Sequence, residues 1–166
     1  MAVESITDTT QYLTFKLGDE LFALDIGKVR EVLDFTSLTK VPQTPDYMRG
    51  VINLRGSVVP VVDLRLKFGM TMAEQTVNTC VIIVEVDMGG ENVVMGAMAD
   101  SVQEVLDLDP DHIEPPPRIG AKLNMDFIRG MGKHAEQFII ILDIDKVFTT
   151  GELEMVHEHE PVAVNG

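Results

Sequence analysis

Cys80 is the only cysteine of the 166-residue chain and the one thiol that could act as a nucleophile. It opens the apolar run CVIIVEV, in which no base or cation stands beside it. A thiol becomes reactive next to such a group, whereas a thiol among aliphatic side chains stays protonated. We therefore expect Cys80 to be a small buried hydrophobe, and a single cysteine excludes an intramolecular disulfide.

Other signatures of chemistry are missing from the sequence. It has no serine-nucleophile motif, no phosphate-cradling glycine loop and no dinucleotide fingerprint. Two of the four histidines, His157 and His159, lie in the acidic stretch HEHE, which could hold a divalent cation weakly. Structural zinc sites have a different ligand spacing, so a solvated tail is favoured. We expect no catalytic residue, no bound metal and no cofactor.

Asp63 and Asp143 are the two carboxylates whose matching positions could suggest an acid–base pair. Each ends an apolar run, VVPVVD and FIIILD, and they are 80 residues apart. A carboxylate at the end of a strand can instead accept a hydrogen bond from the first turn of a following helix. We favour this capping role over acid catalysis.

Arg55 stands in the motif NLRG, where Asn53 and Gly56 bracket a turn that leaves the guanidinium projecting. One interpretation is a solvated turn arginine or a surface ion pair, which contributes little to stability. The other is an interface residue, because arginine is enriched at the energetic centre of protein–protein contacts. The residues alone leave both interpretations open.

The composition bounds the class of protein. A formal charge of −14 argues against binding to nucleic acid or to an anionic membrane surface, both of which attract clusters of Lys and Arg. Hydrophobic residues make up 45% of the chain and tryptophan is absent, so the core must be aliphatic. The N-terminus has no signal-peptide core, and no run of about 18 apolar residues could insert in a membrane. We expect a soluble cytoplasmic protein.

Most of the apolar runs are predicted to form short strands separated by turn residues. Hairpins are predicted at 12–26, 50–64 and 80–99, each with glycine in its turn. Pro60 lies inside one of these runs, which predicts an edge strand or a bulge there. The run at 127–148 closes the fold.

The order of these elements occurs twice. Matching residues lie 80 positions apart in the later part of each copy and 73 apart in the earlier part: Arg49 and Arg129, Asp63 and Asp143, Phe68 and Phe148, and EVL at 31–33 and 104–106. The offset changes within a proline-rich loop, where extra residues are easily accommodated. The sequence therefore predicts an internal duplication.

Each copy has short strands at close spacing, a pattern typical of a small barrel, in which closure removes exposed strand edges. We predict a mainly β protein with two tandem five-stranded barrels, related by a pseudo-two-fold axis and accompanied by a few short helices. The first barrel is expected at 11–72 and the second at 73–148. We expect a flexible tail at 1–10 and an acidic tail or frayed helix at 149–166.

The stretches YLTFKLGDELFALDIGKVREVL and VPQTPDYMRGVINLRGSVVPVVDLRLKFG closely resemble the CheW family of bacterial chemotaxis coupling proteins, and the likeness covers Gln11 to Phe148. The resemblance implies two SH3-like barrels packed around an aliphatic core. It also implies a scaffold without catalytic activity that joins methyl-accepting chemotaxis receptors to the regulatory domain of the histidine kinase CheA. Such a protein would reach membrane receptor arrays through these partners.

The resemblance also implies site residues. Val29 and Glu31 of KVREVL fall on positions in a receptor-facing groove between the barrels, and Gly50 and Arg55 on positions tied to coupling and receptor binding. The helical hairpin tip of a receptor would lay its apolar face in that groove. Kinase-contacting residues are not implied one by one.

Two alternatives remain open. The chain could be an adaptor of the same fold in a non-flagellar chemosensory pathway; the start at Met1 and the absence of a receiver-domain motif favour such an adaptor over a fragment of a larger protein. The second alternative is a small acidic metal-binding protein or enzyme, which predicts a bound ion or a deep polar pocket.

Overall fold

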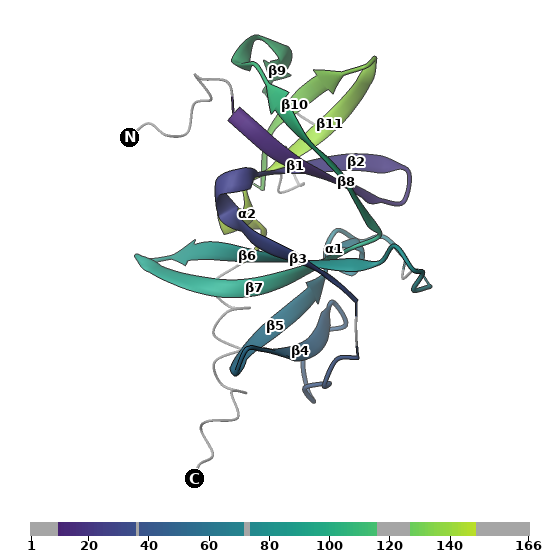
Figure 1. Ribbon diagram of the computed structural model, residues 1–166, viewed down its shortest axis with the longest axis vertical. Helices are drawn as coiled ribbons and strands as arrows, with labels where there is room; N and C mark the ends of the chain where they lie inside the picture. Colours follow the sequence, from purple (N-terminus) through teal and green to yellow (C-terminus); the bar gives the residue numbers. More distant parts are fainter. Residues whose placement is uncertain (1–9, 36, 72–73, 116–126, 149–166) are drawn as a thin grey trace.

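The computed structural model describes residues 10–35, 37–71, 74–115 and 127–148, which form two β-sheets stacked along the long axis of the molecule (Figure 1). The six-stranded sheet has the order β8 (Ser101–Leu108), β1 (Thr10–Leu17), β2 (Glu20–Asp25), β11 (Gln137–Leu142), β10 (Ile128–His134) and β9 (Ile113–Glu114). The five-stranded sheet has the order β3 (Val29–Asp34), β6 (Cys80–Met88), β7 (Glu91–Ala99), β5 (Ser57–Asp63) and β4 (Met48–Leu54). The predicted mainly β fold is confirmed.

Helices are single turns at the ends of strands: η1 (Ile26–Lys28), α1 (Leu64–Lys67), η2 (Pro110–His112) and α2 (Ile144–Val147). None of the helices in these ranges is long and apolar enough to cross a membrane. Of the expected tails, residues 1–9 and 149–166 lie outside the described residues, and Thr10 begins β1.

The two halves of the sequence exchange their first hairpins. The β1–β2 hairpin of the first half pairs with β8 and β11 of the second, and the β6–β7 hairpin of the second half pairs with β3 and β5 of the first. The expected boundary between residues 72 and 73 therefore does not separate the sheets, because each sheet draws strands from both ranges. Sequence repetition reveals that two equivalent hairpins exist, but not which half each one joins.

The repeat is nevertheless a repeat of structure. The pairing of β4 with β5 shifts between Met48 and Gly50, and that of β10 with β11 shifts between Ile128 and Gly130. The strand orders also match. In the five-stranded sheet β3, the exchanged hairpin, β5 and β4 follow one another, and in the six-stranded sheet their equivalents β8, the exchanged hairpin, β11 and β10 do the same. The six-stranded sheet has one more strand than expected because the two-residue β9 pairs with β10.

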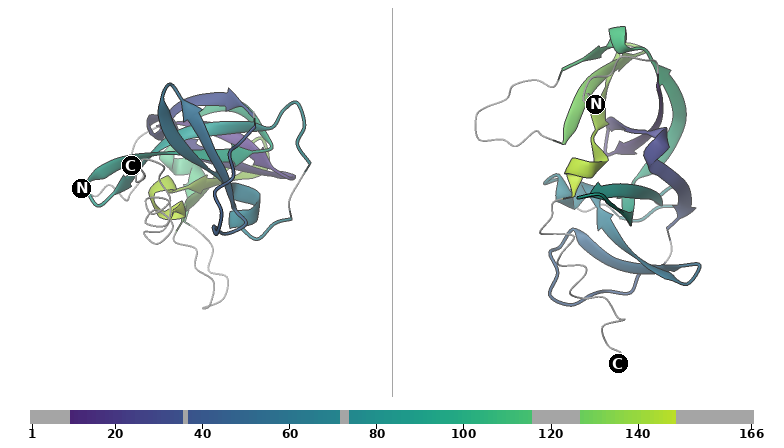
Figure 2. Two further views of the ribbon diagram at one scale, coloured as in Figure 1. Left: turned by 90° about the horizontal axis from the view of Figure 1, so that it is seen from below. Right: turned by 90° about the vertical axis from the view of Figure 1, so that its left-hand side faces the viewer.

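Both sheets curl until their edges approach. In the five-stranded sheet the chain beyond β3 returns to β4, where Thr39 and Val51 exchange backbone hydrogen bonds of 3.0 and 2.9 Å. In the six-stranded sheet β8 leads through η2 into β9, which pairs with β10 at the opposite edge. Figure 2 shows the two curled sheets from further directions. Curling leaves few unpaired strand edges open to solvent.

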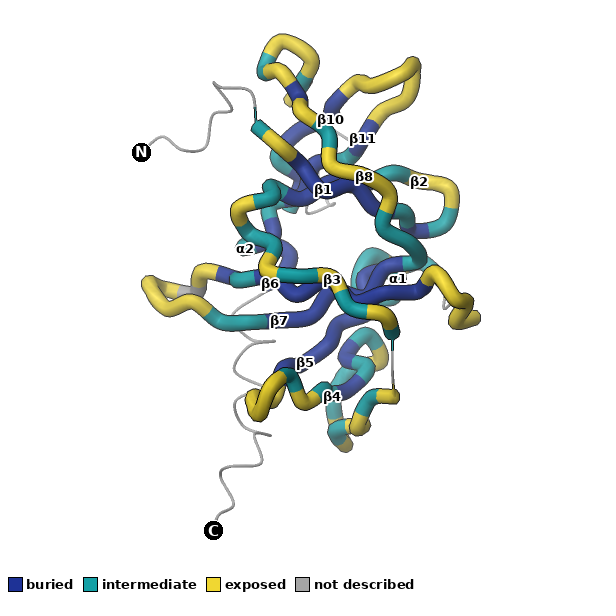
Figure 3. Tube along the Cα trace, in the orientation of Figure 1, coloured by how far each residue is buried: buried dark blue, intermediate teal, exposed yellow. Residues whose placement is uncertain are grey.

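Three clusters of buried side chains fill the described part of the molecule. Figure 3 shows in dark blue the buried stretches of the chain. One cluster lies within each curled sheet, and the largest, which we call the central cluster, joins both sheets and includes Phe15, Leu24, Ile82 and Phe148. Along β6, Ile82 belongs to the central cluster, while its neighbour Ile83 belongs to the cluster inside the five-stranded sheet. Both faces of the exchanged hairpins are thus buried, which explains why consecutive residues such as Val81, Ile82, Ile83 and Val84 are all apolar.

An aspartate ion pair beside each hairpin turn strengthens the contact between the sheets. Asp100, after β7, accepts hydrogen bonds from Arg65 Nε and Nη2 at 2.9–3.1 Å and from the backbone N–H of Gly18, in the β1–β2 turn, at 2.7 Å. Burial raises the pKa of Asp100, but the hydrogen bonds from Arg65 and Gly18 outweigh it, so that pKa is lowered overall.

The other half has the equivalent link with the charges reversed. Lys28 Nζ lies 2.9 Å from an oxygen of Asp145 in α2, and the backbone N–H of Asp87, at the end of β6, donates to Asp145 at 2.8 Å. Arg65 and Asp145 occupy the same position in α1 and α2. In both links a carboxylate therefore reaches the hairpin of the opposite sheet.

The expectation for Pro60 is corrected. β5 lies between β7 and β4, so Pro60 is not on an edge strand. The parallel pairing of β5 with β7 begins only at Val61, one residue later. A residue without an N–H is tolerated there because it precedes that ladder.

Asp100→Asn should lower the free energy of unfolding by about 1 kcal/mol at pH 7, since it replaces a charged acceptor in a half-exposed site. A lowered folded-state pKa stabilises the protein above the ordinary pKa of the carboxyl group, and this stabilisation is lost as the pH falls. The difference between the two proteins should therefore shrink below about pH 4. Urea unfolding between pH 3 and 7 measures it.

The matched control is Asp107→Asn, an exposed aspartate of β8, which should change the stability little at any pH. A stability loss for Asp100→Asn that stays constant with pH would contradict an ionic role for Asp100.

Candidate functional site

Arg55 lies in the two-residue turn between β4 and β5, with Leu54 paired to Ser57. Arg55 has a φ of 51° and Gly56 a φ of 90°, the left-handed pair that a tight hairpin of this kind requires. The backbone N–H of Gly56 donates to Asn53 Oδ1 at 2.7 Å, so Asn53 fixes the turn. The turn holds the Arg55 side chain outward, and 70% of it is exposed.

Arg55 and Glu31 form a bidentate ion pair, with Nη1 and Nη2 at 2.7 and 2.8 Å from the two carboxylate oxygens. Hydrogen bonding to Arg55 lowers the pKa of Glu31, and the same bonds raise the pKa of Arg55. Both groups therefore stay charged at neutral pH. The pair links the β4–β5 turn to β3, the strand at the opposite edge of the sheet.

Val29 and Glu31 lie on β3 on either side of a shift in its pairing with β6. Val29 is half-buried and packs against the central cluster, which places it where the two sheets meet. Val32, the residue after Glu31, is 40% exposed, and Val58, just after the turn, is 48% exposed. Half-buried and exposed residues, both apolar and charged, thus make up this corner of the sheet, which we call the Arg55 corner (Arg55, Glu31, Val29, Val32 and Val58).

Gly50 is placed elsewhere, buried in the middle of β4. Gly50 has a φ of 144°, and a Cβ atom added to it would clash with the carbonyl oxygen of Thr39. Gly50 thus permits the close approach of two backbones that closes the five-stranded sheet. Its repeat mate Gly130 is equally confined, because a Cβ there would lie 2.9 Å from the carbonyl oxygen of Glu114.

Among its described residues, the second half has no counterpart of the Arg55–Glu31 pair. Its β10–β11 turn contains Ala135 and Glu136, both at positive φ, in place of Arg55 and Gly56. Glu104, the repeat mate of Glu31, is exposed. Ala135 has no charge that could pair with the carboxylate of Glu104. The two halves therefore have the same turn backbone but different exposed side chains.

An ion pair that the sequence did not predict, between a half-buried arginine and a buried aspartate, lies near the start of β4. Arg49 Nη1 donates to Asp63 Oδ2 at 2.9 Å, and the other Asp63 oxygen accepts from the backbone N–H of Arg65. Asp143 likewise accepts from the N–H of Asp145 at 3.2 Å. The predicted capping by Asp63 and Asp143 is confirmed, whereas no spacing rule links Arg49 to Asp63.

Cys80 is buried, as predicted, with 5% of its surface exposed. Burial raises its pKa to about 11, so it is protonated at neutral pH and is no nucleophile. Within the described ranges, no group of three His, Cys, Asp or Glu side chains could hold a metal ion. His157 and His159 lie outside the described residues.

Two curled sheets that display an oriented arginine beside exposed valines define a class of protein, the small β scaffold that binds other proteins. Residues 11–152 match the model of the CheW-like domain, and the chain belongs to the CheW family of chemotaxis proteins. The predicted function, a chemotaxis coupling scaffold that is not an enzyme, is confirmed.

Similar proteins cover most of this chain. It is 36% identical to the chemotaxis protein CheW of Klebsiella aerogenes, over 88% of this chain and 86% of that protein. It is 33% identical to the probable chemotaxis protein CheW of Rhizobium etli, over 92% and 97%. The crystal structure of the scaffolding protein TtCheW from Thermoanaerobacter tengcongensis matches with a TM-score of 0.76 and 35% identity, over 87% and 95%.

Gly50→Ala should destabilise the protein by about 2–4 kcal/mol, because the new methyl group meets backbone atoms that cannot move without opening the sheet. Gly89→Ala is the control: Gly89 also has a positive φ, 61°, but no atom lies within 4 Å of its Cβ position. Thermal unfolding of both variants measures the difference. Equal losses would show that the backbone conformation, rather than the contact with Thr39, makes Gly50 necessary.

Proposed function

We propose that this chain couples the cytoplasmic tips of methyl-accepting chemotaxis receptors to the histidine kinase CheA, and that it binds the receptor at the Arg55 corner. Membership of the CheW family supports the choice of partners. The observation that carries the choice of surface is the bidentate Arg55–Glu31 pair, which one half of the duplicated fold has and the other lacks.

The corner suits a helical partner for physical reasons. Val29 lies where the sheets meet, and Glu31 and Val32 follow on the same strand, so apolar and charged residues lie within four positions of one edge strand. A receptor hairpin would bury an apolar stripe against the valines, while Arg55, held in place by Glu31, would donate its remaining hydrogen bonds. An arginine already oriented loses less conformational entropy on binding.

Gly50 contributes to this function indirectly. It allows β4 to approach Thr39 and so sets the position of the turn that carries Arg55. CheA is proposed to bind elsewhere through its regulatory domain, so that receptor and kinase can bind at once. The protein would act in the cytoplasm and reach receptor arrays through these partners.

Arg55→Ala should weaken capture of a receptor cytoplasmic fragment about tenfold while leaving the melting temperature nearly unchanged, because the pair is exposed. Glu31→Ala should weaken it less, since the arginine remains but loses its orientation. Affinity for the receptor fragment and for CheA is measured by titration calorimetry.

Lys133→Ala, which removes an exposed cation from the other sheet, is the matched control and should bind the receptor normally. Unchanged receptor binding by Arg55→Ala would sink the proposed site. Failure of the wild-type chain to bind either partner would sink the proposed function.

A further inference from the structure

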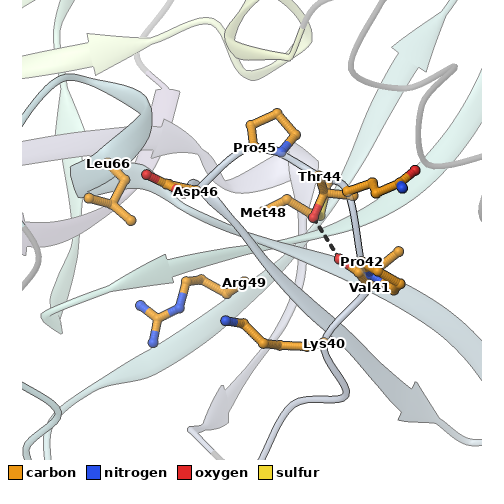
Figure 4. A pocket seen from close by; sticks show the side chains of 10 residues that line it. Lys40, Val41, Pro42, Thr44, Pro45, Asp46, Met48, Arg49 and Leu66 are labelled. Atoms are coloured by element: carbon orange, nitrogen blue, oxygen red, sulfur yellow. Dashed lines mark hydrogen bonds between the residues drawn. The ribbon is translucent and has the colours of Figure 1, made fainter.

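A hollow of about 580 Å³ lies at the end of β4 that is remote from the Arg55 corner (Figure 4). The loop between β3 and β4 forms one wall, and α1 and the start of β4 form the other. Its volume falls within the range of ligand-binding pockets, about 300–1,000 Å³. The proposed function makes no use of this surface, whose lining residues include Lys40, Pro42, Pro45, Met48, Arg49 and Leu66.

The loop that walls the hollow is held in shape by its own hydrogen bonds. Thr44 Oγ1 donates to the carbonyl of Val41 at 2.8 Å, and the backbone N–H of Met48 donates to the carbonyl of Pro45 at 2.9 Å. Gln43, at the tip of the loop, has a φ of 64°. A loop fixed in this way forms the hollow before any ligand arrives.

Two cations flank the hollow in a chain whose formal charge is −14. Lys40 is exposed and has no ion-pair partner among the described residues. Arg49 donates one hydrogen bond to Asp63 through Nη1, and its other N–H groups remain available as donors. Figure 4 shows the charged ends of Lys40 and Arg49 on the same side of the hollow. Asp46 at the rim carries the opposite charge. Carboxylates would therefore be attracted to the Lys40–Arg49 side.

Apolar residues also line the hollow, among them Met48, Leu66 and two prolines, together with the polar Gln43 and Thr44. A ligand with short aliphatic side chains between its carboxylates would therefore contact both the cations and the apolar side chains. The required ligand is an acidic peptide with interspersed apolar residues.

The chain itself contains such a peptide in residues 149–166, TTGELEMVHEHEPVAVNG, which has four glutamates and no Lys or Arg. The glutamates alternate with Leu153, Met155 and Val156. The peptide continues from Phe148, which is buried in the central cluster together with Met48, one of the residues that line the hollow. At about 3.3 Å per residue, its extended length is about 60 Å, more than the diameter of about 40 Å that a compact chain of this length would have.

We propose that the hollow is a binding site for the acidic C-terminal segment of the same chain. Attachment to the body of the protein gives the segment an effective concentration of about 1 mM, so even weak contacts suffice to keep it bound. The attraction between its glutamates and the two cations falls as salt is added. This site is independent of the proposed receptor surface.

The full-length Ala163→Cys variant, carrying a nitroxide on the new cysteine, tests the proposal by NMR. Cys80 is buried and its pKa is about 11, so it stays unlabelled at neutral pH. Amide signals of Lys40, Gln43 and Arg49 should lose most of their intensity, whereas those of Lys133 and Phe138 should keep theirs. The loss should be reversed by replacing the glutamates Glu152, Glu154, Glu158 and Glu160 with glutamine.

Lys40→Gln should weaken the signal loss, and Lys133→Gln, with the same change of charge, should not. Undiminished signals around Lys40, or a loss that survives the four Glu→Gln replacements, would overturn the proposal. It would also be overturned if these signals change only after a receptor fragment or CheA is added, because the hollow would then belong to a partner. These measurements need neither partner, so they are independent of the proposed coupling function.

Discussion

The exchange of hairpins between the two halves is the constraint on which the rest of the structure depends. Each hairpin pairs with strands of the other half and buries one face inside its sheet and the other face in the central cluster. Each half alone would leave three strands without the hairpin between them and a large apolar face in water. The aspartate links at Asp100 and Asp145 secure the same contact. The protein is therefore one cooperative unit despite its duplicated sequence.

Local features were predictable because they depend on neighbouring residues. The hairpins, the capping by Asp63 and Asp143 and the burial of Cys80 follow from alternation, strand ends and apolar runs. The exchange was not predictable, because the two hairpins have equivalent sequence patterns and either hairpin could pair with the strands of either half. The contact between Arg55 and Glu31 was also hidden, although both were singled out, since it depends on how far the sheet curls. For the same reason Gly50 is a packing requirement rather than a surface residue.

Duplication followed by divergence explains how one backbone carries several surfaces. The two halves share turn geometry and pairing shifts, so those features belong to the fold. They differ in the side chains on turns and single-turn helices: Arg55 corresponds to Ala135, and Arg65 to Asp145. Arg65 and Asp145 keep an ion pair at the contact between the sheets although their charges are opposite, whereas the change at Arg55 alters only the exposed surface. Specific recognition can therefore arise in one half alone.

The exchanged topology also governs the order in which the molecule can assemble during synthesis. β1 and β2 cannot pair with β8 and β11 until those strands have been synthesised. The six-stranded sheet therefore lacks its inner strand β11 until residue 142 has been added. A chain with such distant pairings folds late and slowly, and its early strands are open to wrong partners. Two nascent copies on neighbouring ribosomes could exchange hairpins, because each copy offers the other the same strand partners. The high effective concentration of the second half of the same chain favours pairing within one molecule.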